Sequence, residues 1–99
     1  MPDELTAERF AACKGQSFIL RYGEHPPIPA ELIEVSENPR SRQSSDTRMP
    51  FTLVFRGPKG SYIPQQIVEV SHEQLGVLGI FLVPIGSDEH GMRYEAVFN

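Results

Sequence analysis

Apolar and polar residues alternate along most of this chain with a period of two, which predicts a protein built mainly of β-strands. Glycine, proline and polar residues separate the alternating or continuously apolar segments from one another. The strands that we expect span residues 18–22, 30–35, 51–56, 62–70, 77–85 and 92–98. Six short strands joined mainly by tight loops favour a small antiparallel barrel or a compact sandwich. The length of 99 residues fits one domain, residues 1–99.

One segment near the start of the chain departs from this pattern and predicts a helix of two turns, over residues 7–14. Thr6 has a side chain suited to the N-cap, and Gly15 follows as the residue that ends the helix. A helix this short is marginal in water by itself, so we expect its apolar residues, Phe10 and Cys13, to dock on another part of the protein. The helix would then cap an open end of a barrel or cover one face.

Three connections between the strands also have recognisable patterns. Residues 57–60 have the composition of a hairpin loop, which predicts that the third and fourth strands pair. Residues 71–74 have the spacing of a capping box and predict one helical turn that ends at Gly76. Residues 36–49 are polar, show no periodicity and predict a mobile surface loop.

The alternation also predicts which side chains face the interior. The core residues that we expect are Phe18, Leu20, Phe51, Leu53, Phe55, Leu82, Tyr94 and Phe98. The segment 77–85 differs from the others because it is apolar on both faces, with Phe81 and Val83 opposite the face of Leu82. Val54 and Val97 are apolar on the nominal outer faces of their strands.

These outward apolar residues, Phe81, Val83, Val54 and Val97, predict a surface through which the protein docks a partner or a second copy of itself. The alternative is that Phe10 and Cys13 of the short helix cover Phe81 and Val83 within the same chain.

The balance of charge limits the partners that we expect. The chain has 13 acidic and 9 basic residues and a formal net charge of −4. Nucleic acids and anionic membranes attract clustered Lys and Arg, so we expect neither as a partner. A single cysteine allows no intramolecular disulfide, and neither a secretory signal nor an apolar stretch of the ~20 residues of a membrane helix is visible. We therefore expect a cytoplasmic protein.

Basic residues concentrate only in the segment 36–49, where Arg40, Arg42 and Arg48 give a small positive bias. Glu37 and Asp46 partly offset that bias. The three arginines are therefore either side chains of a solvated loop or a contact for an acidic partner.

No group of residues predicts catalysis, a metal or a cofactor. His25, His72 and His90 all fall in expected loops and lack the spacing of metal ligands. Asp88, Glu89 and His90 are adjacent and are compatible with a metal or general base, but the tip of a solvated hairpin explains them equally well. Cys13 lies late in its helix, where the dipole disfavours a thiolate, so we interpret it as a core residue.

The C-terminal segment resembles the signature of a family of small bacterial domains of unknown function. The resemblance rests on Leu82-Val83-Pro84-Ile85-Gly86, on Asp88 and Gly91, and on the run from Tyr94 to Asn99. It extends to most of the chain apart from residues 36–49. The family has no assigned activity, so no catalytic residue is implied. The resemblance implies an association with phage-tail-like proteins of the tail-collar type, which no residue of this chain demonstrates.

We therefore expect a non-enzymatic interaction or structural module, with a protein partner or a homo-oligomer. The alternative is a small-ligand-binding β-barrel or an unrecognised hydrolase. An enclosed pocket with convergent polar groups would favour the ligand-binding alternative, and a flat apolar patch would favour the interaction module.

Overall fold

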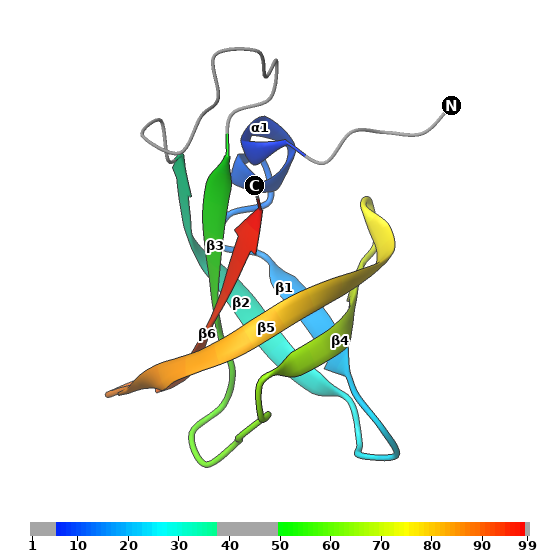
Figure 1. The fold of residues 1–99 in the computed structure, drawn as a ribbon, viewed down its shortest axis with the longest axis vertical. Coiled ribbons are helices and arrows are strands. Elements are labelled where there is room, and N and C mark those ends of the chain that lie inside the picture. Colours follow the sequence, from blue (N-terminus) through cyan, green and yellow to red (C-terminus); the bar gives the residue numbers. More distant parts are fainter. Residues whose placement is uncertain (1–5, 38–49, 99) are drawn as a thin grey trace.

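The computed structural model describes residues 6–37 and 50–98, which form a closed antiparallel barrel with one short helix (Figure 1). The elements are α1 (Ala7–Ala11), β1 (Ser17–Arg21), β2 (Ile28–Glu37), β3 (Phe51–Arg56), β4 (Gln66–His72), β5 (Gly76–Asp88) and β6 (Gly91–Phe98). Around the barrel the strands follow the order β1-β2-β3-β6-β5-β4, and β4 pairs with β1 to close it. The predicted mainly β class is confirmed, and the barrel is the correct one of its two alternatives.

Large apolar side chains fill the interior of the barrel. Of the eight predicted core residues, seven are buried, and Phe98 is half-buried against the same cluster. Burial alternates along β1 and β4 as the period of two requires, with Phe18 and Leu20 facing inward on β1. Aromatic rings make up much of the filling, as in the edge-on contact between Phe18 and Phe55 at 5.2 Å.

The helix α1 is shorter than the sequence predicts. Thr6 is its N-cap, because the Thr6 side chain accepts a hydrogen bond from the Arg9 N–H at 3.3 Å. The helix ends at Ala11 rather than at residue 14, and the N–H of Cys13 bonds three residues back to the carbonyl of Phe10. The chain has to turn here, because the N–H of Gly15 already donates to the carbonyl of Leu32 on β2.

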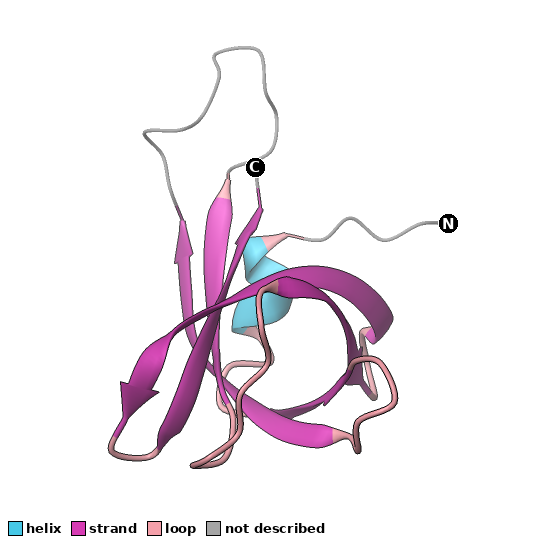
Figure 2. Cartoon of the chain, turned by 60° about the horizontal axis from the view of Figure 1, so that its bottom comes forward, coloured by secondary structure: helices cyan, strands magenta, loops and turns pink. Residues whose placement is uncertain are grey.

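The apolar face of α1 packs into one end of the barrel, near the start of β3 and the end of β6 (Figures 1 and 2). Phe10 is fully buried, and its ring lies 5.8 Å from the rings of both Phe51 and Phe98. Cys13 is also buried, as a member of the core. The prediction that Phe10 and Cys13 dock on the rest of the protein is therefore confirmed, and they do so in the core, at one end of the barrel.

The connection between β3 and β4 differs from the predicted hairpin. β3 pairs with β2 on one side and with β6 on the other, so residues 57–65 must cross to the opposite part of the barrel before β4 begins. A buried anchor holds this crossover, because the hydroxyl of Tyr94 accepts a hydrogen bond from the N–H of Ile63 at 3.1 Å. The turn composition of residues 57–60 was a local signal, whereas strand pairing is decided by the closure of the whole barrel.

Two further connections also differ. Instead of a helical turn, residues 73–75 form a tight turn that joins β4 to β5, with His72 opposite Gly76 in the ladder. The prediction of a loop from residue 36 is wrong at its start, because Ser36 and Glu37 continue β2 and pair with β3. The rest of that segment, including Arg40, Arg42 and Arg48, lies outside the described residues.

Candidate functional site

An apolar surface lies on the outer side of β4 and β5. Ile67 on β4 stands directly opposite Phe81 on β5, and Val77 stands opposite Ser71. The exposed fractions of Ile67, Val77 and Phe81 are 69%, 63% and 49%. We call these three residues the outer apolar face.

Gly79 leaves a hollow in the middle of the outer apolar face. It lies between Val77 and Phe81 along β5 and opposite Glu69 on β4, and a Cβ placed there would lie 3.7 Å from the side chain of Ile67. A shallow depression opens at this point, and Arg21 and Glu69, which are cross-strand neighbours, form its polar border. The surface therefore combines apolar side chains with one charge of each sign.

The structure separates the four apolar residues predicted to form a docking surface. Phe81 and Val97 are exposed, Val97 at 55%, and Val83 is half-buried. Val54 is only 6% exposed, so it does not belong to an exposed surface as the sequence suggested. In the ladder, Val54 lies between Glu34 on β2 and Glu95 on β6.

The helix does not cover Phe81, contrary to the alternative considered from the sequence. Phe10 contacts Phe51 and Phe98 on the inside of the barrel, whereas Phe81 points outward and keeps 49% of its surface exposed. Within the described residues, α1 therefore stabilises the core and leaves the outer apolar face uncovered.

Sequence reasoning missed two members of the outer apolar face, Ile67 and Val77. The signal for Ile67 was present, since Val68 and Val70 face inward and Ile67 must then face outward by alternation. The signal for Val77 required the register, which places it opposite Ser71 on the same outer side.

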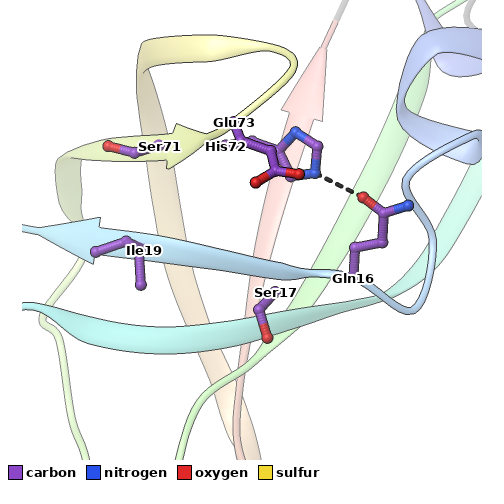
Figure 3. A pocket seen from close by; sticks show the side chains of 6 residues that line it. All are labelled: Gln16, Ser17, Ile19, Ser71, His72 and Glu73. Carbon is purple, nitrogen blue, oxygen red and sulfur yellow. Dashed lines mark hydrogen bonds between the residues drawn. The ribbon is translucent and has the colours of Figure 1, made fainter.

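A second depression lies where the end of β4 meets the start of β1 (Figure 3). Its lining consists of Gln16, Ser17, Ile19, Ser71, His72 and Glu73. His72 is the member with catalytic potential, and it is buried rather than exposed in a loop as predicted. His72 shares the inward direction of Val68 and Val70, so the alternation of β4 did contain this information.

Both ring nitrogens of His72 are occupied by the fold. Nδ1 accepts hydrogen bonds from the N–H groups of Gln74 and Leu75, at 3.1 and 3.4 Å. With Nδ1 as an acceptor, the neutral ring carries its proton on Nε2 and donates it to Oε1 of Gln16, at 2.7 Å. The ring also packs against Phe18, with centroids 4.5 Å apart. His72 thus holds the turn between β4 and β5 and connects it to β1.

The serines of this depression are not hydrogen-bonded to His72. Figure 3 shows the hydroxyls of Ser17 and Ser71 directed away from the imidazole, and the only hydrogen bond drawn among the lining residues joins His72 to Gln16. A nucleophile has to lie within hydrogen-bond reach of its base, so this geometry does not favour the hydrolase alternative.

The other histidines lie apart from one another. His25 stacks on the ring of Tyr22 at 4.5 Å, and His90 lies 3.6 Å from the carboxylate of Glu89 at the tip of the β5–β6 hairpin. Across residues 6–37 and 50–98, no three His, Cys, Asp or Glu side chains come together as metal ligands.

The hairpin that carried the family resemblance is held together by Asp88. Its Oδ1 accepts hydrogen bonds from the N–H groups of His90 and Gly91, at 2.8 and 3.0 Å, and its Oδ2 pairs with Arg56 at 3.1 Å. The pKa of Asp88 is held below its usual range, mainly by the hydrogen bond from the N–H of His90. Partial burial acts in the opposite direction and raises the pKa, whereas the Arg56 guanidinium lowers it further.

Position 91 requires glycine because two backbone segments approach each other closely there. A Cβ on Gly91 would collide with the carbonyl oxygen of Gly57, and the φ of Gly91, +155°, also favours glycine. The N–H of Gly57 donates to the carbonyl of Met92 at 2.8 Å. Asp88, Gly91 and Tyr94 are among the residues on which the family resemblance rests. Asp88 and Gly91 therefore build the hairpin, and Tyr94 fixes the crossover.

Fold and surfaces together define a small six-stranded antiparallel barrel with a filled interior and an apolar outer face. The chain belongs to the family of domains of unknown function DUF6916, which matches residues 5–98. No curated protein and no solved structure matches it. No helix within the described part of the chain is long and apolar enough to cross a membrane.

Proposed function

We propose that this domain is a non-enzymatic interaction or structural module, which binds a protein partner or a second copy of itself through the outer apolar face. The observation that carries the proposal is the direct pairing of Ile67 with Phe81 on the outside of the barrel, beside Val77. Large apolar side chains that gather on an outer surface are typical of protein interfaces. The border of Arg21 and Glu69 adds polar groups of the kind found at the rim of such interfaces.

The filled interior supports this function over a ligand-binding barrel. A small-molecule site needs an enclosed space with convergent polar groups, whereas large side chains such as Tyr94, Phe55 and Leu32 are fully buried inside this barrel. The depressions beside Gly79 and His72 are open and lie on the outer surface.

A phage-tail-like assembly is the context in which we place this role. The support for it is the association with tail-collar proteins that the family resemblance implies.

The test measures the mass of the protein in solution by light scattering over a range of concentrations, together with NMR spectra of its amides. We expect a dimer, or a complex with a co-purified partner, and Phe81→Glu and Ile67→Glu should each dissociate it without unfolding. Lys59→Glu, an exposed change in the crossover, is the matched control and should leave assembly unchanged. The proposal would be contradicted by a protein that stays monomeric at millimolar concentration and whose amide signals on β4 and β5 do not shift when a candidate partner is added.

A further inference from the structure

Half of β2 has a partner on one side only. From Glu31 to Glu37 it pairs with β3, but on the other side β1 accompanies it only from Ile28 to Glu31. Two backbone hydrogen bonds follow, in which the N–H of Gly15 donates to the carbonyl of Leu32 and the N–H of Leu32 donates to the carbonyl of Gln16. Beyond Leu32 the segment that precedes β1 no longer accompanies β2, because it leads back to α1. The rest of β2 continues beside β3 (Figure 1). In the described chain, residues 33–37 therefore offer a strand edge with no partner strand.

This edge has only part of the usual protection. Natural edge strands avoid unwanted pairing through charged side chains, Lys above all, through Pro or a bulge, or through a covering helix or loop. Here Glu34 and Glu37 are the charged residues. The segment Ile33-Glu34-Val35-Ser36-Glu37 contains neither Lys nor Pro, and the irregularity of β2 falls at Ile33, so residues 34–37 keep a regular register with β3. The edge is thus a regular template of backbone donors and acceptors.

A groove runs along the same edge, between β2 and α1. It is lined by Ala7, Glu8 and Ala11 of the helix and by Val35 and Glu37 of the strand. Ala7 and Ala11 lie one turn apart and carry only methyl groups, which leaves space between the helix and the strand. Glu8 and Glu37 are both exposed and add negative charge to the groove.

We propose that residues 33–37 accept an added β-strand from another protein, and that the incoming segment is extended, basic at its ends and small and apolar in its middle. Its main chain would take the place that β1 leaves, in the manner of β-strand addition. Valine- or threonine-sized side chains fit beside Ala7, Ala11 and Val35, and Lys or Arg at the ends complements Glu8 and Glu37. This site is separate from the outer apolar face and does not depend on it.

The test is an NMR titration of the labelled protein with the capped peptide Lys-Thr-Val-Thr-Val-Thr-Lys. We expect shifts and slower hydrogen exchange at the amides of residues 33–37, with smaller shifts in α1. The same peptide with proline at its central position should not bind, because proline removes a backbone donor and resists the ladder. The version with Glu at both ends should bind about two- to fivefold more weakly, the range of an exposed ion pair.

Matched variants of the protein locate the site. Ala11→Trp fills the groove and should weaken binding of the Lys-ended peptide at least tenfold, whereas Ala12→Trp, next to it but outside the lining, should change the affinity less than twofold. An unchanged spectrum at residues 33–37 with millimolar peptide, or equal binding of the proline peptide, would overturn the proposal. Shifts confined to Ile67 and Phe81 would also overturn it while leaving the proposed function intact.

Discussion

At the scale of single residues, direction in the barrel wall decides what a side chain contributes. Leu53 is fully buried, and Val97, on the paired strand β6, is 55% exposed. Leu53→Ala removes packed methyl groups and leaves a cavity, so we expect it to lower the free energy of unfolding by about 2–5 kcal/mol. Val97→Ala should change it by less than about 0.5–1 kcal/mol. Urea unfolding of both variants measures the difference, and equal losses would contradict the described orientation of β3 and β6.

Asp88 predicts how the protein responds to acid. Its pKa is lowered in the folded state, chiefly by the N–H of His90, so its ionised form stabilises the fold at neutral pH. That stabilisation is complete above the ordinary carboxyl value of 3.8 and is lost as the pH falls through the lower folded pKa. Asp88→Asn should therefore be less stable at pH 7 and lose less stability than the wild type between about pH 4 and pH 2.

Chemical unfolding at a series of pH values measures this response. Glu89→Gln is the matched control, since the neighbouring side chain of Glu89 is 85% exposed and no pKa shift is resolved for it. Identical acid profiles for Asp88→Asn and the wild type would show that the hydrogen bonds of the hairpin tip do not favour the carboxylate.

At the scale of elements, the crossover 57–65 depends on one buried hydroxyl. Tyr94 is fully buried, and its hydroxyl accepts the N–H of Ile63 at 3.1 Å. Tyr94→Phe keeps the ring but leaves that N–H without its partner, which we expect to cost about 1–3 kcal/mol. Hydrogen exchange of the Ile63 amide should accelerate by more than the change in global stability explains. Tyr62→Phe is the control, because the ring of Tyr62 is 57% exposed.

The strands could be predicted from the sequence because each one reveals its period of two within a few residues. All six exist, and β2 and β5 extend further than expected, to Glu37 and Asp88. The prediction for the fourth strand is wrong at its start, because residues 62–65 belong to the crossover and β4 begins at Gln66. The order of the strands could not be obtained this way. The pairing of Ile19 with Ser71 or of Phe51 with Phe98 joins segments far apart in the chain, and no local turn signal reports it.

The candidate sites were less accessible to sequence reasoning than the strands. The exposure of Phe81 followed from a strand that is apolar on both faces, but its partner Ile67 became visible only with the register of β4 and β5. Val54 is buried between two neighbouring strands, where it pairs with Glu34 on β2 and with Glu95 on β6, and local alternation does not report these partners. The free edge of β2 follows from the unequal lengths of β1 and β2, because β2 continues to Glu37 whereas the expected strand ended at residue 35.

At the scale of the whole molecule, the barrel consists of two three-stranded halves that are joined by two strand pairings. β1, β2 and β3 pair in sequence, as do β4, β5 and β6, while the contacts of β1 with β4 and of β3 with β6 join the halves. Each half can form its pairings locally, whereas both joins close long loops and carry a larger entropic cost before they stabilise the fold.

The crossover between β3 and β4 therefore has a consequence for the order of folding events. Each half is a unit able to gain structure early, and the rate-limiting step should be the simultaneous formation of the two joins. We expect Val70→Ala and Phe98→Ala, at the joins, to slow folding in proportion to their effect on stability, and Val35→Ala, in the β2–β3 half away from both joins, mainly to speed unfolding. Stopped-flow refolding of these variants measures the two rates separately. A barrel whose strand order followed the chain would have one such closing step, and this one has two that must succeed together.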